Sequence, residues 1–297
     1  MRKDVSFKAT DGTTLRGWHY LPDDSGKHPT IVMAHGFSAV KEMYLDEYAE
    51  AFVQAGLASL VYDNRNFGAS DGDPRQEIDP WLQIRDYSDA ITFVRSLEHT
   101  DADRIGIWGS SYSGGHVLVV AAIDRRVKCV VSQVPVISGW QNFRRLVRAD
   151  FLAPLQAGLH SDRDSRAAGG APGMLPVVAE DPMAPSALAT ADSYKWFTTT
   201  ATARAPAWRN EVTLRTIEYG FGYEPGAYIG LVSPTPMLMI VGINDHLTVS
   251  DLAIAAYERA YEPKRLVLLS GGHFDAYVEL FDQSAGAACE WFRKYLR

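Results

Sequence analysis

The residues of this 297-residue chain best suited to covalent chemistry form the run Gly109-Ser-Ser-Tyr-Ser-Gly-Gly115. The run follows the β-rich residues 104–108 and precedes the apolar, helix-like residues 116–122. A strand, a sharp turn and a helix in this order can hold a serine hydroxyl exposed as a nucleophile. The same pattern also occurs in plain connections between a strand and a helix. Other residues must therefore show whether this turn carries a nucleophile.

Steric space selects one serine of this run. Residues two positions before and after a nucleophile in such a turn must be small, because larger side chains collide with the neighbouring strand and helix. Ser110 would place Trp108 at the first of these positions, and Ser113 lies too far beyond the predicted strand end. Ser111 has Gly109 before it and Ser113 after it. We therefore predict Ser111 as the nucleophile, although Ser113 stands where a glycine is usual.

Two polar groups further along the chain can activate this serine. Asp245 follows the apolar run 237–241, and His273 follows the next apolar run, 265–269, after two glycines. A parallel sheet gathers the carboxyl ends of its strands along one edge, so the three residues can converge there. We predict His273 as the general base and Asp245 as the acid that orients it.

Two other carboxylates compete for the role of the acid. Asp275 is too close in sequence to His273 to be the first choice. Asp251 lies at the start of a predicted helix, where capping explains it better. Asp245 remains the preferred residue.

The run His35-Gly-Phe37 directly follows the predicted strand at residues 30–34. A loop in this position, together with the residue after the nucleophile, supplies the backbone N–H groups of an oxyanion hole. We expect the N–H groups of Phe37 and Tyr112 to stabilise the developing alkoxide, each by roughly 3 kcal/mol. We interpret His35 as a structural loop residue.

The polar segment 62–72 contains glycines and carboxylates but fits neither a phosphate loop nor a metal site. It lacks the Lys and Ser/Thr of a P-loop, and its carboxylates do not have EF-hand spacing. We interpret it as a turn network built on Asp63 and Arg65. The histidines show no zinc-binding spacing, and we predict neither a metal nor another cofactor.

Periodicity predicts an α/β fold around these residues. Short β-rich runs that predict strands lie at residues 30–34, 58–62, 104–108, 127–131, 237–241 and 265–269. Segments with helical periodicity lie between them or after them, at residues 45–55, 84–97, 250–261 and 283–296. This alternation predicts a mostly parallel, doubly wound sheet covered on both faces. Residues 5–20, around the turn Asp11-Gly12, predict an antiparallel hairpin at one edge.

The strand pattern is interrupted once, between residues 137 and 233. Within this segment, residues 161–191 are rich in Gly, Pro, Ala and Asp and show little periodicity. A structureless loop of this length inside a compact core would be unusual. We therefore assign 137–233 to an inserted cap, and 1–136 with 234–297 to the catalytic domain. The many aromatic residues of the cap favour a medium-sized, partly aromatic or polyketide-like acyl substrate.

Composition and charge restrict the partners. The formal charge of −7 is spread without long single-sign runs, which argues against nucleic acid and anionic membranes. No apolar run is long enough to span a bilayer, and the first residues lack the apolar region of a signal peptide. Cys129 and Cys289 do not form a disulfide framework. We predict a cytoplasmic protein acting on a small-molecule ester or acyl substrate; homo-oligomer formation stays open.

Taken together, these motifs resemble the α/β-hydrolase superfamily, in its branch that contains dienelactone hydrolases and Xaa-Pro dipeptidyl-peptidases. The motifs that carry the resemblance are at residues 35–37, 63–72, 109–115, 234–245 and 272–274. Residues 208–214 and 271–277 are similar, more weakly, to polyketide transferases of fungal pathways. The resemblance implies Ser111, Asp245 and His273 as a catalytic triad, with Phe37 and Tyr112 as backbone donors.

These inferences predict a serine hydrolase that cleaves an ester or thioester through an acyl-enzyme. Acyl transfer to an alcohol or thiol would use the same residues, and so would cleavage of a peptide. Dehalogenases and epoxide hydrolases would need Asp at the nucleophile position. A non-catalytic binding protein on the same fold is the alternative from another class, against which the intact triad counts.

Overall fold

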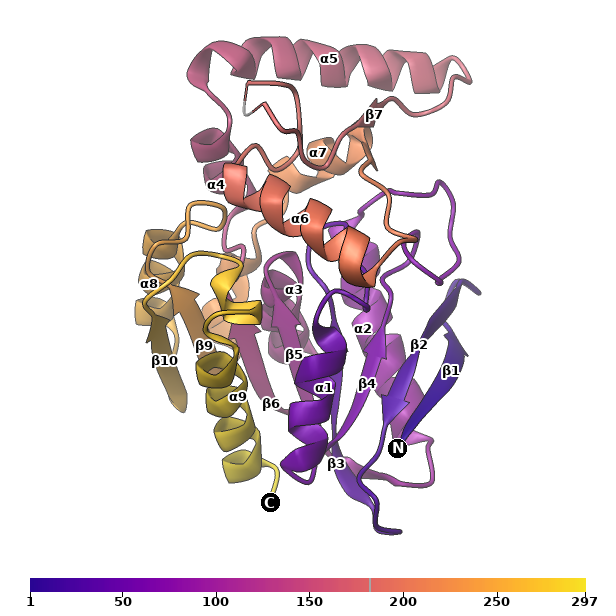
Figure 1. The fold of residues 1–297 in the computed structure, drawn as a ribbon, viewed down its shortest axis with the longest axis vertical. Coiled ribbons are helices and arrows are strands. Elements are labelled where there is room, and N and C mark those ends of the chain that lie inside the picture. The colour runs from indigo at the N-terminus through magenta and orange to yellow at the C-terminus, as the bar shows by residue number, and fades with distance from the viewer. Residues whose placement is uncertain (182) are drawn as a thin grey trace.

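The computed structural model describes residues 1–181 and 183–297, and an eight-stranded sheet forms the centre of this part (Figure 1). The strands, in their spatial order, are β1 (Arg2–Lys8), β2 (Thr14–Tyr20), β4 (Ala58–Tyr62), β3 (His28–Ala34), β5 (Thr100–Ser110), β6 (Val127–Gln133), β9 (Met237–Gly242) and β10 (Lys264–Leu269). All neighbouring pairs from β4 to β10 are parallel. The hairpin β1–β2 joins β4 in antiparallel orientation. The predicted sheet, with its antiparallel edge hairpin, is confirmed.

Helices cover both faces of the sheet, as the alternating pattern predicts. The helices of this layer are α1 (Leu45–Gln54), α2 (Pro80–Arg95), α3 (Tyr112–Ile123), α8 (Ser250–Arg259) and α9 (Phe281–Tyr295). Helices α1 and α9 pack on each other on one face, and α2 and α3 pack on each other on the other (Figure 1). Helix α1 buries Leu45, Tyr48, Ala49 and Phe52 along one stripe. Helix α3 is apolar on all sides and is buried over nearly its whole length.

The strand register brings the predicted motifs to one edge. Ala34, the last residue of β3, pairs with Gly109 of β5. Ser110 at the end of β5 pairs with Gln133 at the end of β6. Leu269 pairs with Gly242, so β10 and β9 also end level with each other. The turns after these strands therefore lie side by side, as expected for parallel strands.

Residues 137–233 lie largely beyond this edge of the sheet (Figure 1). They contain α4 (Gly139–Leu146), α5 (Ala149–Ala167), β7 (Met174–Leu175), α6 (Ala191–Arg204), β8 (Val212–Thr213), α7 (Leu214–Phe221) and the 3-10 helix η1 (Pro225–Leu231). Helices α4, α5, α6 and α7, together with β7, are seen above the sheet in Figure 1. The 3-10 helix η1 instead packs against α3 and α8, within the layer that covers the sheet.

The stretch 161–191 is more ordered than its weak periodicity predicts. Its first seven residues complete α5. There Arg166 donates to Asp162 at 2.8 Å, and the other oxygen of Asp162 accepts from the N–H of Gly173 at 2.6 Å. These polar contacts hold the end of a mostly exposed helix. An apolar periodicity cannot reveal a helix that is stabilised in this way.

The turn network predicted for residues 62–72 is present. Asp63 accepts from the backbone N–H of Lys41 at 2.9 Å and from its ammonium at 2.7 Å. Arg65 forms a two-pronged contact with Asp86, at 2.7 Å and 2.5 Å. Burial raises the pKa of Asp63, which the Lys41 ammonium opposes. The segment is thus tied to its neighbours by buried ion pairs.

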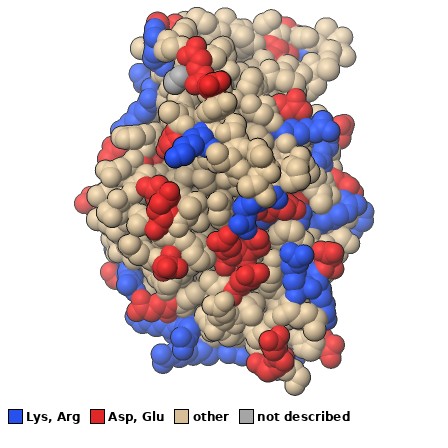
Figure 2. All heavy atoms as spheres, in the orientation of Figure 1, with Lys and Arg blue, Asp and Glu red and all other residues tan. Residues whose placement is uncertain are grey.

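Acidic and basic side chains are interspersed over the face shown in Figure 2. This mixture agrees with the moderate net charge of −7. Both cysteines, buried Cys129 and partly buried Cys289, are free thiols. Among the helices of the described residues, none combines the length and the apolar character needed to cross a bilayer.

Candidate active site

Ser111 occupies the sharp turn between β5 and α3. Its backbone has φ 60° and ψ −117°, a strained conformation for a residue other than glycine. The N–H of Ser111 donates to the carbonyl of Gln133 at 2.9 Å, and its carbonyl accepts from Val136 at 3.0 Å. The loop after β6 therefore holds the turn in place. The side chain of Ser111 is only 8% exposed.

The structure shows why the positions flanking Ser111 must be small. A Cβ atom on Gly109 would lie 2.2 Å from the carbonyl oxygen of Ser113, which is far closer than atoms can approach. Ser113 is buried, and its hydroxyl donates to the carbonyl of His35 at 2.5 Å. A serine is thus tolerated in place of the usual glycine because its hydroxyl has a partner.

Asp245 and His273 form a buried hydrogen-bonded pair. Nδ1 of His273 lies 2.7 Å from Oδ2 of Asp245. The other carboxylate oxygen, Oδ1, accepts from the backbone N–H groups of Leu247 and Thr248, each at 2.8 Å. These bonds fix the carboxylate as an acceptor directed at the imidazole. The sequence order and the strand ends that suggested this pair thus bring the two side chains together.

Sequence reasoning missed Thr248. Its Oγ1 lies 2.9 Å from Oδ2 of Asp245, 3.1 Å from Nδ1 of His273 and 2.8 Å from the carbonyl oxygen of Val134. A hydroxyl three residues after the acid was the only signal in the sequence. Val134 has φ 36°, which is rare for a β-branched residue and could not be foreseen.

The two competing carboxylates are engaged elsewhere. Asp275 accepts from the backbone N–H of Gly272 at 2.8 Å, and so shapes the turn before His273. Asp251 lies in the first turn of α8, as predicted, but its carboxylate pairs with Arg145 at 2.5 Å instead of capping the helix. Neither of them contacts His273 through a hydrogen bond in the described structure.

His35 has a structural environment. Its Nδ1 accepts from the N–H of Gly36 at 2.8 Å, so the proton resides on Nε2, which donates to the carbonyl of Met43 at 2.9 Å. Burial lowers the pKa of His35 to about 4, so the ring is neutral at pH 7. A Cβ on Gly36 would lie 2.7 Å from Cβ of Ser111. The 35–37 loop therefore packs directly against the serine.

Phe37 and Tyr112, the predicted backbone donors, lie close to Ser111. Tyr112 is the first residue of α3, so its N–H has no acceptor within the helix and lies at the positive end of the helix dipole. The rings of Phe37 and Tyr112 pack edge to face, with centroids 5.7 Å apart. Both residues line the same small cavity as Ser111.

Two small cavities meet at Ser111, and we name each after one of its wall residues. The Phe143 lobe is lined by residues that include Tyr112, Val136, Asn142, Phe143, Leu146 and Thr248. The Trp196 lobe is lined by residues that include His35, Trp196, Phe197, His273, Phe274 and Tyr277. Ser111, Phe37, Leu188 and Leu247 line both. The volumes are about 30 Å³ and 10 Å³, so little free space lies beside Ser111.

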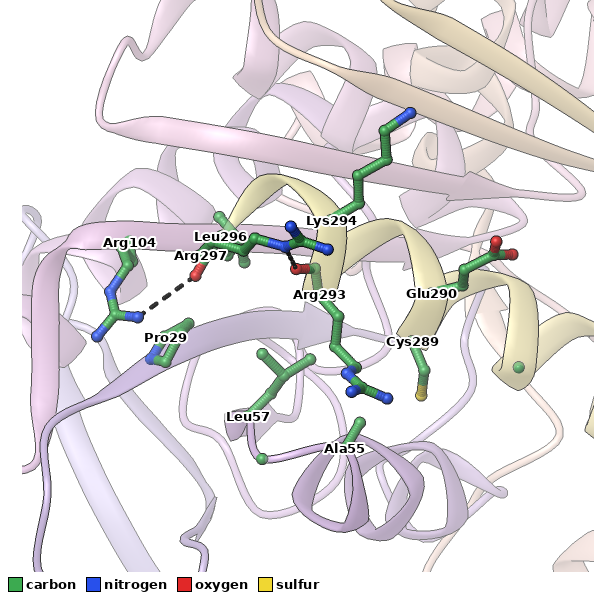
Figure 3. A pocket seen from close by; sticks show the side chains of 12 residues that line it. Pro29, Ala55, Leu57, Arg104, Cys289, Glu290, Arg293, Lys294, Leu296 and Arg297 are labelled. Atoms are coloured by element: carbon green, nitrogen blue, oxygen red, sulfur yellow. Dashed lines mark hydrogen bonds between the residues drawn. The ribbon is translucent and has the colours of Figure 1, made fainter.

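A larger cavity, of about 700 Å³, lies far from these residues, at the amino-terminal ends of the strands. Figure 3 shows it between the end of α9 and the start of β4, with Arg104 donating to the carbonyl of Leu296. Arginine and lysine side chains border much of it. None of the predicted site residues lines it.

Comparisons with known proteins agree with this geometry. The family model described as X-Pro dipeptidyl-peptidase (S15 family) matches residues 11–275. A thiohydrolase of Eupenicillium brefeldianum is 34% identical over 92% of this chain and 88% of its own length. A polyketide transferase of Aspergillus fumigatus is 32% identical over 92% of this chain and 91% of its own.

A solved structure, that of DcsB in complex with its substrate analogue, superposes with a TM-score of 0.87 at 31% identity. The superposition covers 99% of this chain and 100% of DcsB. The resemblance to α/β hydrolases and, more narrowly, to polyketide transferases is confirmed. The chain therefore belongs to the X-Pro dipeptidyl-peptidase (S15) family of serine hydrolases.

Proposed function

We propose that this protein is a serine hydrolase that cleaves a carboxylic ester or thioester of a small to medium-sized molecule. The observation that carries the proposal is the buried pair of Asp245 and His273, at the same sheet edge as the strained turn of Ser111. The thiohydrolase relative supports a thioester as one substrate type. In this proposal, Ser111, His273 and Asp245 form the catalytic triad.

We infer a reaction through an acyl-enzyme, which the pairing of His273 with Asp245 supports. The hydrogen bond from Nδ1–H of His273 to Asp245 leaves Nε2 as the proton acceptor. Ser111 attacks the acyl carbonyl and transfers its proton to His273, which then protonates the departing alcohol or thiol. Water, deprotonated by His273, cleaves the acyl-enzyme and regenerates the Ser111 hydroxyl. Backbone N–H groups of Phe37 and Tyr112 bind the oxyanion in both halves of the reaction.

Acyl transfer is a second candidate function. It differs only in the second half, where an alcohol or thiol takes the place of water. The burial of Ser111, which is 8% exposed beside cavities of about 30 Å³ and 10 Å³, favours it, because few water molecules fit next to the acyl-enzyme. The polyketide transferase relative supports the same reading.

We further propose that residues 137–233 act as a cap on this site. Phe143, Leu188 and Trp196 all come from this segment and line the two lobes. A typical ligand site has a volume of roughly 300–1,000 Å³. Substrate entry therefore requires a movement of the cap or of its side chains.

The free thiols of Cys129 and Cys289 support a reducing compartment such as the cytoplasm.

Labelling with a fluorophosphonate probe, followed by mass-spectrometric mapping of the modified peptide, tests the proposal. We expect a single adduct on Ser111. A panel of esters and thioesters, assayed with and without an added alcohol or thiol, then measures how the acyl-enzyme divides between water and the acceptor. A folded protein that neither reacts with the probe nor turns over any ester would instead be a binding protein on this fold.

A further inference from the structure

The two lobes at Ser111 differ in the chemistry of their walls. In the Trp196 lobe, the ring of Trp196 stacks on Phe274 with centroids 4.8 Å apart and lies 5.4 Å from Tyr277. The Phe143 lobe is lined by Phe37, Tyr112 and Phe143 together with the aliphatic residues Val136, Leu146, Leu188 and Leu247. Aromatic rings packed on one another therefore dominate the Trp196 lobe, while the Phe143 lobe has a mixed aromatic and aliphatic wall.

Charged side chains are excluded from both lobes. No Asp, Glu, Lys or Arg is among the described residues that line them. The amide of Asn142 is engaged, because its nitrogen donates to the carbonyl of Leu247 at 2.8 Å. His35 is neutral at pH 7 because burial lowers its pKa to about 4. An ammonium or carboxylate on either arm of a substrate would thus be buried without a partner.

The position of His273 indicates which part of the substrate each lobe receives. The group that protonates the leaving group must reach the leaving oxygen or sulfur within hydrogen-bond distance. His273 lines the Trp196 lobe and does not line the Phe143 lobe. Resting on the function proposed above, we propose that the Trp196 lobe receives the leaving group and the Phe143 lobe receives the acyl group. The substrate is then an ester or thioester with two uncharged apolar arms, of which the leaving arm contacts aromatic walls.

Leu188 and Leu247 form the boundary, since both line both lobes. Leu247 also donates its N–H to Asp245, which restricts its movement. Leu188 lies in an irregular stretch, held by its N–H on the carbonyl of Val177 at 2.8 Å. Both leucines are therefore held in place by backbone hydrogen bonds.

The assignment has a kinetic consequence that separates the two lobes. The leaving group has departed before deacylation begins, so the Trp196 lobe binds an arm of the substrate during acylation alone. The acyl group is present in both steps, so the Phe143 lobe contributes to acylation and to deacylation. Rapid-mixing kinetics with 4-nitrophenyl esters resolve the two steps as a burst and a steady-state rate.

The experiment compares Trp196→Leu and Phe143→Leu with the wild type on two substrate series. One series varies the acyl group of 4-nitrophenyl esters from acetyl to hexanoyl, and the other varies the leaving group of acetate esters from methyl to naphthyl. For Trp196→Leu we expect kcat/KM on naphthyl acetate to fall by about tenfold relative to methyl acetate, with deacylation unchanged. For Phe143→Leu we expect the acetyl-to-hexanoyl preference and the deacylation rate constant to change together.

Trp140→Ala is the matched control, because Trp140 is 43% exposed, packs on Phe221 and lies outside both lobes. We expect it to leave the acyl-group and the leaving-group preferences unchanged. If Trp196→Leu fails to fold, Trp196→Phe takes its place. The assignment of the lobes would be wrong if Trp196→Leu altered deacylation and Phe143→Leu altered only the leaving-group preference. That result would leave the proposed function standing. A wild-type enzyme without a burst and without label on Ser111 would overturn the proposed function, and this assignment with it.

Discussion

The hydroxyl oxygen of Thr248 lies 3.1 Å from Nδ1 of His273, beside the carboxylate oxygen of Asp245 that the same Nδ1 contacts. Thr248 has one proton for two nearby acceptors, Asp245 and the carbonyl of Val134. Its lone pairs can also accept from the imidazole N–H. The hydroxyl therefore restricts the orientation of both members of the pair, and we treat Thr248 as a positioning residue.

Replacing Thr248 tests this role. Thr248→Val keeps the shape of the side chain and removes one hydroxyl, so we expect kcat to fall about five- to tenfold, as for the loss of one buried hydrogen bond, with KM nearly unchanged. Thr248→Ser restores the hydroxyl and should recover most of kcat. Equal kcat values for the two variants would show that the hydroxyl has no part in orienting His273.

The choice of serine within the turn is tested by exchanging Ser111 and Ser113 separately for alanine. Ser111→Ala should abolish ester hydrolysis and probe labelling, while its melting temperature stays close to that of the wild type. Ser113→Ala should keep the label on Ser111 but lower the free energy of unfolding by about 1 kcal/mol, because the carbonyl of His35 loses one of its two donors and keeps only Asn64. Loss of labelling in Ser113→Ala alone would move the nucleophile to that residue.

Asp245→Asn tests whether Asp245 is the acid that orients His273. The amide cannot hold the imidazole in the required tautomer, so we expect kcat to fall by roughly 10³- to 10⁴-fold with a far smaller effect on stability. Asp275→Asn is the companion variant, since Asp275 accepts from Gly272 and only shapes the turn. We expect it to lower kcat much less. If Asp275→Asn had the larger effect on kcat, the acid would have to be reassigned.

Much of the fold and of the candidate site follows from local sequence signals. The strands could be predicted because buried parallel strands are short apolar runs, and the turn of Ser111 because Gly109 has no room for a side chain. The pairing of Asp245 with His273 followed from the position of each after a strand, since parallel strands end at one edge.

Other features depend on contacts between distant segments and leave no local pattern. Thr248 acquires its role only because Val134 and His273, from two other loops, lie beside it. Leu188, which lines both lobes, lies in an irregular stretch. Individual backbone hydrogen bonds, such as that to Val177, fix the position of this stretch. Neither could be predicted from spacing or periodicity.

The contact of Gly36 with Ser111 predicts a strong effect of a single methyl group. In Gly36→Ala, the new Cβ would lie 2.7 Å from Cβ of Ser111 and 2.9 Å from the carbonyl oxygen of Ser110. Neither neighbour is free to move, so we expect kcat/KM to fall by at least about 100-fold through displacement of the oxyanion loop. Gly286→Ala is the control, since its Cβ would meet nothing within 4 Å in α9. Unchanged kcat/KM in Gly36→Ala would show that the loop position does not limit the reaction.

The buried imidazole of His116 predicts how stability depends on pH. Its Nε2 donates to Oε1 of Gln83 at 2.9 Å, and its Nδ1 accepts from the hydroxyl of Tyr223 at 2.7 Å. Burial lowers the pKa of His116 from 6.5 to about 3. Between these two values the unfolded chain binds a proton that the folded chain does not. The free energy of unfolding therefore falls as the pH falls below 6.5, and this contribution is constant above that value.

Urea unfolding of the wild type and of His116→Gln at pH 7.5, 6.5, 5.5 and 4.5 measures this contribution. The wild type should lose up to about 1.4 kcal/mol per pH unit more than the variant over the acidic part of this range, because one histidine contributes at most one proton. His35, whose pKa burial lowers to about 4, contributes in the same direction in both proteins and cancels in the comparison. The variant should be less stable at pH 7.5, since Gln83 and Tyr223 lose a matched partner. Parallel curves for the two proteins from pH 7.5 to 4.5 would mean that His116 becomes protonated within the folded protein.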